Sequence, residues 1–229
     1  MLGRFVQGAN RTLVRNQRAA FSNWAGLSAA PADPILGLND AFKKCTDPRK
    51  VLLGMGAYRD DDGKPFILPC VRRAEEIILE RDMDHEYAGI QGIDSYVDKC
   101  LTLAYGENNR ARKEGRIAGA QSISGTGSLR LGLQFFSTWY PHKDIDFLIP
   151  NSTWPIHRTI ADIVGYENWS NYRYYDPTTK GLDFEGFKED LNNAKDHSLV
   201  MLHVCAHNPT GVDPTPAQWE EVLEIVQRK

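Results

Sequence analysis

From residue 120 to its end, the chain alternates short runs expected to be strands with amphipathic helical stretches. The runs typical of strands cover residues 120–123, 145–149, 171–175 and 198–205. The helical stretches cover residues 125–139, 156–164 and 184–193, and a last one begins at Thr215. Because strands that alternate with helices pair in parallel, this order predicts an α/β fold, a mostly parallel sheet with helices on both faces.

Capping residues mark the ends of two of these helices. Gly165 follows the stretch 156–164 as an expected C-cap. The last helix should begin with Thr215 as N-cap, Pro216 in the first helical position and Gln218 in the third. Its expected core face consists of Trp219, Val222, Leu223 and Val226.

The part of the chain before residue 120 is less regular. We expect a short helix at residues 38–44, a strand at 51–55, a polar turn at 60–65, and helices after Pro69 and at 93–105. The helix after Pro69 has apolar side chains at three- and four-residue spacing, namely Val71, Ala74, Ile77 and Ile78.

The first 32 residues differ from the rest in charge. They contain four arginines and no acidic residue, since Asp33 is the first acid of the chain. Drawn as a helix, the arginines lie opposite an apolar face. Such a start is typical of a mitochondrial transit peptide, which predicts that residues 1–32 are a targeting segment and that the protein resides in the mitochondrial matrix. A disordered or surface-binding basic tail is the alternative.

The composition is that of an ordinary globular protein, with 41% hydrophobic and 25% charged residues. The formal net charge of −3 gives no reason to expect a nucleic-acid partner. No apolar run approaches the roughly 18 residues of a membrane-spanning helix. The cysteines are not spaced like zinc ligands, so we expect no metal site and free, mostly buried thiols at Cys45, Cys70, Cys100 and Cys205.

Small and hydroxylated residues connect the expected strand at 120–123 to the helix after it, in the segment Ser124-Gly125-Thr126-Gly127. The glycines let the backbone come close to a ligand, and the unpaired N–H groups of a helix N-terminus favour an anion. The segment therefore predicts a phosphate site. Close packing of strand against helix is the alternative.

A second polar segment follows the strand expected at 198–205 and reads His207-Asn208-Pro209-Thr210-Gly211. Ligands of parallel α/β sheets lie at the carboxyl ends of the strands, so the Asn208 amide is expected to face the same crevice as the phosphate site. The peptide bond before Pro209 can be cis. An ordinary turn is the alternative, since Asn and Pro are common turn residues.

These two segments, in this order, resemble those of the class I pyridoxal-phosphate-dependent aminotransferases, and within them the aspartate aminotransferases of mitochondrial type. Further segments match the family's pattern: Gly54-Met55-Gly56-Ala57-Tyr58, Glu86-Tyr87, Gln91-Gly92, Thr153-Trp154 with His157, and Tyr172 to Pro177. The resemblance implies a fold-type I transferase with an incomplete large domain. Residues 33–65 would be the N-terminal arm and part of the small domain, and residues 66–229 the N-terminal part of the cofactor-binding large domain.

The resemblance also implies which residues bind the cofactor, pyridoxal 5'-phosphate. Ser124, Gly125 and Thr126 would hold its phosphate, and Trp154 would stack on its pyridine ring. Tyr87 would reach the phosphate held by the other subunit of a homodimer.

Other positions acquire roles around the ring and the substrate. Asn208 would donate to the phenolic oxygen of the ring, and Gly56 would offer its backbone N–H to the substrate. Trp154 and Asn208 would also contact the substrate. His157 would orient the acid that pairs with the ring nitrogen. Taken singly, Trp154 and Tyr87 could equally be core aromatics, and His157 and His203 structural histidines.

The chain departs from the family's pattern on both sides of Trp154. Ser152 stands where the family usually has Pro, and Pro155 stands where it usually has Gly. The loop that carries Trp154 could therefore follow a different path from the family's.

The reaction implied is transfer of an amino group between aspartate and 2-oxoglutarate, which gives oxaloacetate and glutamate. No lysine of this chain stands in the family's Ser-x-x-Lys context, so the Schiff-base lysine is not expected on it. We therefore predict a fragment that has no catalytic residue and is inactive alone. Two alternatives remain: a non-catalytic truncated isoform, and a nucleotide-binding α/β domain, which would lack a full G-x-G-x-x-G.

Overall fold

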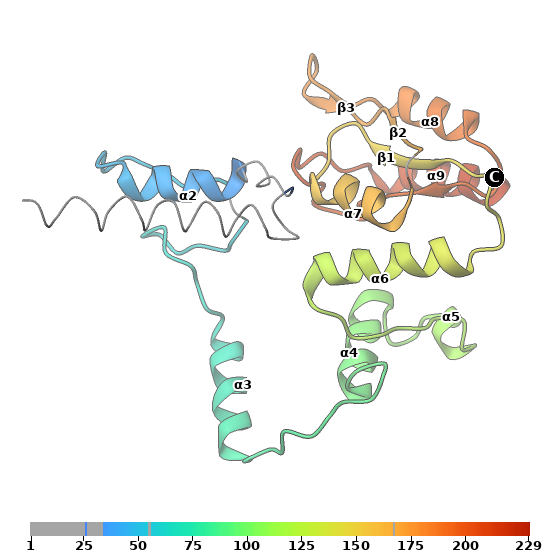
Figure 1. The fold of residues 1–229 in the computed structure, drawn as a ribbon. Coiled ribbons are helices and arrows are strands. Elements are labelled where there is room, and N and C mark those ends of the chain that lie inside the picture. The colour runs from blue at the N-terminus through green and yellow to red at the C-terminus, as the bar shows by residue number, and fades with distance from the viewer. Residues whose placement is uncertain (1–25, 27–33, 55, 167) are drawn as a thin grey trace, which may run out of the picture. The chain divides into compact units, whose positions relative to one another are not determined.

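The computed structural model describes residues 26, 34–54, 56–166 and 168–229. The chain divides into two compact units, Met1–His85 and Glu86–Lys229. In the described part, the first unit contains helices α2 (Pro34–Lys44) and α3 (Pro69–Glu80), and the second contains every strand (Figure 1). The domain boundary predicted after residue 65 stays a prediction. The leader predicted for residues 1–32 lies outside the described residues, apart from residue 26.

The first unit has the expected helices but not the expected strand. α3 begins at Pro69 as predicted, yet none of its residues is buried, so its apolar face is exposed. The turn at residues 60–65 is confirmed, because the Asp60 N–H donates to the Lys64 carbonyl at 2.9 Å. Residues 51–54 form no strand, so that prediction is wrong for the described part of the segment. A strand requires a partner, and no described segment pairs with these residues.

The helices of the second unit are α4 (Asp94–Tyr105), α5 (Arg110–Lys113), α6 (Ser124–Trp139), α7 (Ile156–Val164), α8 (Phe184–Asn193) and α9 (Pro216–Arg228). All but the short α5, which the sequence did not predict, lie close to the expected positions. Gly165 ends α7 in the left-handed conformation with φ 96°, which glycine adopts without strain. Thr215 and Gln218 form the predicted capping box at the start of α9.

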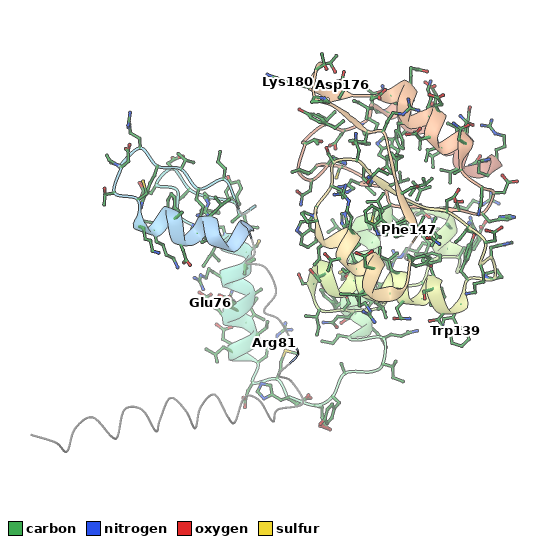
Figure 2. The ribbon with its side chains drawn as sticks, turned by 45° about the horizontal axis from the view of Figure 1, so that its top comes forward. Glu76, Arg81, Trp139, Phe147, Asp176 and Lys180 are labelled. Carbon is green, nitrogen blue, oxygen red and sulfur yellow. The ribbon has the colours of Figure 1, made fainter. Side chains whose placement is uncertain are left out.

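Three strands form a parallel sheet in the order β2-β1-β5. They are β1 (Phe147–Pro150), β2 (Trp169–Tyr172) and β5 (Leu199–Val200), and the register pairs Phe147 with both Trp169 and Leu199. Strands β3 (Tyr175–Asp176) and β4 (Gly181–Leu182) form a separate antiparallel hairpin. Asp176 and Lys180 mark its outer end in Figure 2.

Three predicted strands differ from the structure. The strand expected at 171–175 is divided between β2, which ends at Tyr172, and β3, which begins at Tyr175. Residues 120–123 form no strand, because this segment runs beside the loop before α4, where the Gln121 N–H donates to the Gln91 carbonyl at 2.8 Å. The strand expected at 198–205 is reduced to the two residues of β5, which pair with β1 on one side. Strand length depends on pairing, which a local apolar run does not specify.

Alternation along β1 creates a core on each face of the sheet. Leu148 packs with Phe187 and Leu191 of α8 and with Val222 and Ile225 of α9. Its neighbours Phe147 and Ile149 point to the opposite face, where they pack with residues of α6 and α7, among them Leu133, Ile160 and Ala161. Figure 2 shows Phe147 inside this unit and Trp139 at its outside. The predicted arrangement of helices on both faces of a parallel sheet is confirmed.

The core face predicted for α9 is correct in part, and the prediction about the cysteines is wrong. On α9, Val222 is buried as expected and Trp219 packs against the core, whereas Leu223 is 52% exposed, Val226 is also exposed, and Ile225 is buried instead. All four cysteines are free and exposed rather than mostly buried. Within the described ranges, every helix is too short or too polar to cross a membrane.

Candidate functional site

The predicted phosphate segment forms the first turn of α6. Ser124, Gly125 and Thr126 are all exposed there. The Gly127 N–H donates to the Ile123 carbonyl, whereas the N–H groups of Gly125 and Thr126 have no acceptor in the described part of the chain. Unpaired N–H groups and the positive end of the helix dipole suit an anion at this point. A side-chain carbon added at Gly125 would meet no atom within 4 Å, so the space beside this backbone is open.

The serines before and after this turn are linked to each other. Ser122 Oγ and Ser128 Oγ lie 2.5 Å apart, and the Ser128 hydroxyl donates to the Ser124 carbonyl at 2.9 Å. These two bonds hold the extended segment against α6, with Ser124 at φ 57° between them. The bend that exposes the first N–H groups of the helix is therefore fixed by side chains.

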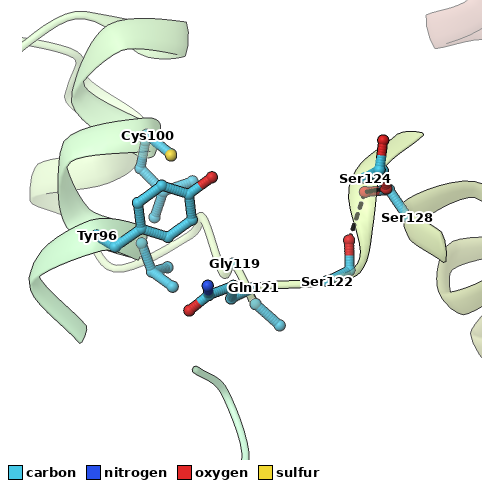
Figure 3. A pocket seen from close by; sticks show the side chains of 10 residues that line it. Tyr96, Cys100, Gly119, Gln121, Ser122, Ser124 and Ser128 are labelled. Carbon is cyan, nitrogen blue, oxygen red and sulfur yellow. Dashed lines mark hydrogen bonds between the residues drawn. The ribbon is translucent and has the colours of Figure 1, made fainter. Parts of the chain in front are cut away.

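A cavity of about 320 Å³ lies beside this bend. Figure 3 shows Tyr96 and Cys100 of α4 on one side of it and the three serines Ser122, Ser124 and Ser128 on the other. Ser128 also lines a larger, mostly apolar cavity of about 460 Å³, together with Leu202 from the segment after β5. The start of α6 thus lies near the carboxyl end of β5.

The loop before α4 is tied to the same segment. The Gln121 side chain accepts from the Ile93 N–H at 3.0 Å. Gly92 has φ 94°, and a side-chain carbon added there would lie 2.2 Å from Gln121 Cβ. Only glycine fits at this contact, which explains the residue at position 92. Tyr87, in the same loop, is fully exposed.

The turn between β1 and α7 carries Trp154. Thr153 is buried, Trp154 is half-buried, and the Trp154 ring meets the His157 ring edge to face at 5.7 Å. The Asn151 side chain accepts from the Ser152 N–H at 2.8 Å and the Tyr175 N–H at 3.2 Å. Hydrogen bonds therefore fix the turn at Ser152, where the family usually has proline.

Three histidines form one cluster with this turn, in which His157 and His207 are buried and His203 is partly buried. Thr153 Oγ1 lies 2.8 Å from His157 Nδ1 and 2.9 Å from His203 Nε2. The Asn208 backbone N–H donates to His203 Nδ1 at 3.2 Å. The rings of His203 and His207 lie 4.2 Å apart, and His207 stacks on Tyr174 at 4.0 Å. The cluster thus joins the turn after β1 to the loop after β5.

The hydrogen-bond donors in this cluster can be assigned by starting from the Asn208 backbone N–H. The Asn208 amide is always a donor, so His203 Nδ1 accepts and the proton of neutral His203 lies on Nε2. That proton goes to the Thr153 oxygen, and the Thr153 hydroxyl donates to His157 Nδ1. The proton of His157 therefore lies on Nε2, and this N–H is the last donor in the series of hydrogen bonds.

Burial keeps these imidazoles neutral. It lowers the pKa of His157 to about 4, and the His203 ring, whenever it is protonated, and the Arg158 charge act in the same direction. It also lowers the pKa of His207 to about 4 and lowers the pKa of His203. Removal from water disfavours the charged form, so the tautomers assigned above hold at neutral pH.

A carboxylate holds the loop that carries Asn208. Asp213 accepts from the N–H groups of Ala206 at 2.7 Å and His207 at 2.9 Å, and these bonds lower its pKa. The peptide bond between Asn208 and Pro209 is cis. The Asn208 side chain itself is exposed.

The structure thus brings some predicted site residues together. Trp154, His157 and the Asn208 backbone belong to the histidine cluster, and Ser124, Gly125 and Thr126 form the exposed first turn of α6. Gly56 is exposed in the first unit. Sequence reasoning missed the roles of Thr153 and His207 and treated His203 as an isolated structural residue. The four-residue spacings Thr153–His157 and His203–His207 were the available signal.

Comparisons with known proteins identify the family of this chain. A family model described as aminotransferase class I and II matches residues 48–229. Mitochondrial aspartate aminotransferase of Schizosaccharomyces pombe is 44% identical over 219 residues, which cover 96% of this chain and 49% of that protein. The chain thus spans about half the length of the curated relatives it matches.

Solved structures of aminotransferases are also similar to this chain. Cytoplasmic aspartate aminotransferase of Giardia lamblia has a TM-score of 0.84 and 40% identity, covering 91% of this chain and 50% of that one. An aromatic-amino-acid aminotransferase of Burkholderia pseudomallei, described as covalently bound to pyridoxal phosphate, has a TM-score of 0.85 and 39% identity, covering 91% and 51%. Motifs, fold and relatives agree, and the chain belongs to the class I and II aminotransferases.

Proposed function

We propose that this chain provides the N-terminal part of an aspartate aminotransferase that uses pyridoxal phosphate to exchange an amino group between aspartate and 2-oxoglutarate. The observation that carries the proposal is the first turn of α6, where two N–H groups without acceptors in the described chain lie beside exposed hydroxyls at Ser124 and Thr126. A phosphate monoester matches this set of donors. The named relatives, which are aspartate aminotransferases, support the choice of substrates.

The residues of α6 would hold the cofactor at its phosphate. The N–H groups of Gly125 and Thr126 and the hydroxyls of Ser124 and Thr126 would donate to the phosphate oxygens. The open space beside Gly125 lets the phosphate approach the backbone. The helix dipole adds a favourable interaction with the negative charge.

The histidine cluster would serve the ring of the cofactor. Pyridoxal phosphate, when bound, supplies the electron sink for the charge that develops at the amino acid α-carbon. Trp154 would cover one face of the ring, and the Asn208 side chain would donate to its phenolic oxygen. His157 presents an N–H at Nε2, which suits a carboxylate that pairs with the ring nitrogen.

The remaining roles rest on the resemblance. Gly56 would offer its backbone N–H to the substrate, and Tyr87 would reach the phosphate of the other subunit in a homodimer. No residue of this chain is assigned as the lysine that binds the cofactor covalently, so the chain by itself should not transaminate. The mitochondrial names of the curated relatives and the Arg-rich residues 1–32 support residence in the mitochondrial matrix.

Cofactor binding tests the phosphate assignment. Pyridoxal phosphate should bind the purified chain more tightly than pyridoxal, which lacks the phosphate, in equilibrium dialysis. Thr126→Val should weaken binding of pyridoxal phosphate about fivefold or more, since it removes a hydrogen bond to a charged group. Thr138→Val, on the same helix far from its first turn, is the matched control. Equal binding of both compounds would refute the assignment.

A second pair of variants tests the ring side of the site. Asn208→Ala should weaken binding of pyridoxal phosphate, whereas Asn193→Ala at the end of α8 should not. If neither variant changes the dissociation constant, Asn208 does not face the cofactor. Preferential binding of a dinucleotide such as NADH would favour the nucleotide-binding alternative instead.

A further inference from the structure

We propose that Arg158 is a positioning residue that fixes the turn bearing Trp154, an inference that rests on the proposed role of Trp154 at the cofactor ring. Arg158 lies in the first turn of α7, next to His157. One nitrogen of its guanidinium group, Nη2, donates to the carbonyls of Asn151 at 2.9 Å and Pro150 at 3.4 Å. These carbonyls lie where β1 ends and the turn begins.

The same nitrogen also reaches the neighbouring strand. It lies 3.3 Å from Asn171 Oδ1 of β2. The guanidinium group lies over the Trp169 ring at 5.6 Å, and that ring is fixed by a 2.7 Å bond from Trp169 Nε1 to Asp162 Oδ1. Arg158 therefore ties together the carboxyl ends of β1 and β2 and the start of α7, with its planar group held in one orientation.

This placement is poor if judged only as a contribution to stability. A positive charge in the first turn of a helix opposes the helix dipole. Among the described residues Arg158 forms no ion pair, and its Nε is buried without an acceptor. Its charge also disfavours protonation of His157. The contacts that it does make converge on the turn, which indicates that the geometry of the turn is what the arginine serves.

The turn depends on such contacts. In its path from Asn151 to Trp154, the backbone is held by the Asn151 side chain, by the buried Thr153 hydroxyl and by Arg158. The Asn151 amide also donates to the Tyr175 carbonyl at 3.3 Å. Without the guanidinium group, the Asn151 and Pro150 carbonyls would lose their protein donor, and the turn could shift relative to α7.

Hydrogen exchange of the full chain tests the inference. Arg158→Met keeps the apolar stem and removes the donors, and it should speed exchange of the amides of residues 151–154 about tenfold. Amides of α9 should exchange as in the unchanged chain. Arg158→Lys should restore part of the protection, because one ammonium group can still reach a carbonyl. Arg110→Met, which removes an exposed arginine paired with Glu114, should change nothing in this segment.

The outcomes separate this inference from the proposed function. Unchanged exchange at residues 151–154 in Arg158→Met would overturn the inference. An equal increase in exchange throughout the second unit would also overturn it, because Arg158 would then have a merely structural role. The dissociation constant of pyridoxal phosphate should rise about threefold to tenfold in Arg158→Met, since the turn loses hydrogen bonds from a charged donor. A faster-exchanging turn with unchanged cofactor affinity would also overturn it. Failure of the unchanged chain to bind the cofactor would refute the proposed function, while the exchange experiment would still judge the role of Arg158 in the turn.

Discussion

The Thr153 hydroxyl has one proton and lies between two imidazoles. It accepts from His203 and donates to His157, so Nδ1 of His157 carries no proton, and the Asn208 N–H that donates to Nδ1 of His203 requires the same of that ring. Protonation of His157 at Nδ1 would place a second donor against the hydroxyl. The geometry of the turn that holds Trp154 is therefore linked to the protonation of a buried ring.

This linkage predicts acid sensitivity. The folded-state pKa of His157 and His207 lies near 4, below the 6.5 of an exposed histidine. The unfolded chain therefore binds more protons between these values. The contribution of each neutral ring to the free energy of unfolding is complete above pH 6.5. It is lost as pH falls toward 4, by at most about 1.4 kcal/mol per pH unit for each ring.

Urea unfolding between pH 7 and pH 4.5 would measure this dependence. The double variant His157→Asn and His207→Asn should be less stable at pH 7 but should show a flatter decline in unfolding free energy on acidification. A decline as steep as that of the unchanged chain would mean that other groups cause it.

A second prediction at the scale of the residue concerns Gly92. Its positive φ disfavours any side chain, and a methyl group there would collide with the Gln121 Cβ. Gly115 has a positive φ of 67° but open space around it, so it is the matched control. Gly115→Ala should destabilise the chain by about 1–2 kcal/mol. Gly92→Ala should cost about 1–3 kcal/mol more, because of overpacking. Equal urea midpoints for the two variants would contradict this contact.

At the level of elements, helix ends were predictable and strand lengths were not. Gly165 and Thr215 were identified from the sequence because a cap depends on residues within one turn of it. The segments 51–54 and 120–123 were wrongly expected to be strands, since a short stretch of sequence does not reveal whether a partner strand lies beside it. The same reason limited what the sequence could predict about the site. Trp154, His157 and Asn208 were proposed from local motifs and stay predictions, whereas the hydrogen bond from His203 to Thr153 joins residues 50 positions apart and was not foreseen.

The capping box of α9 permits a test at this level. The Thr215 hydroxyl accepts from the Gln218 N–H at 3.3 Å, and the Gln218 side chain accepts from the Thr215 N–H at 2.9 Å. Thr215→Ala should lower the unfolding free energy by about 1 kcal/mol, and Thr215→Ser should cost much less. Loss of stability in both variants alike would show that the methyl group, rather than the hydroxyl, matters.

At the scale of the whole molecule, the buried core belongs to the second unit. The three-layer arrangement around β1 lies within residues 86–229, and in the described part of the first unit α3 buries none of its residues. Large apolar side chains are nevertheless exposed in both units, among them Leu53, Leu79 and Leu103. Exposed apolar surface of this kind is typical of contact regions.

The two units should differ in their resistance to proteolysis. Tyr87 lies just after the division between them, outside any helix or strand, and is fully exposed, whereas Tyr172 in β2 is 1% exposed. Proteases cut exposed, irregular backbone first, so brief chymotrypsin treatment should cleave after Tyr87 and leave a product that begins at Ala88 and persists. Mass spectrometry would identify the product. Tyr87→Ser should remove this cut and leave cleavage at any other site unchanged. Cleavage after Tyr172 as early as after Tyr87 would mean that the sheet and its two layers of helices do not form a stable core in this chain.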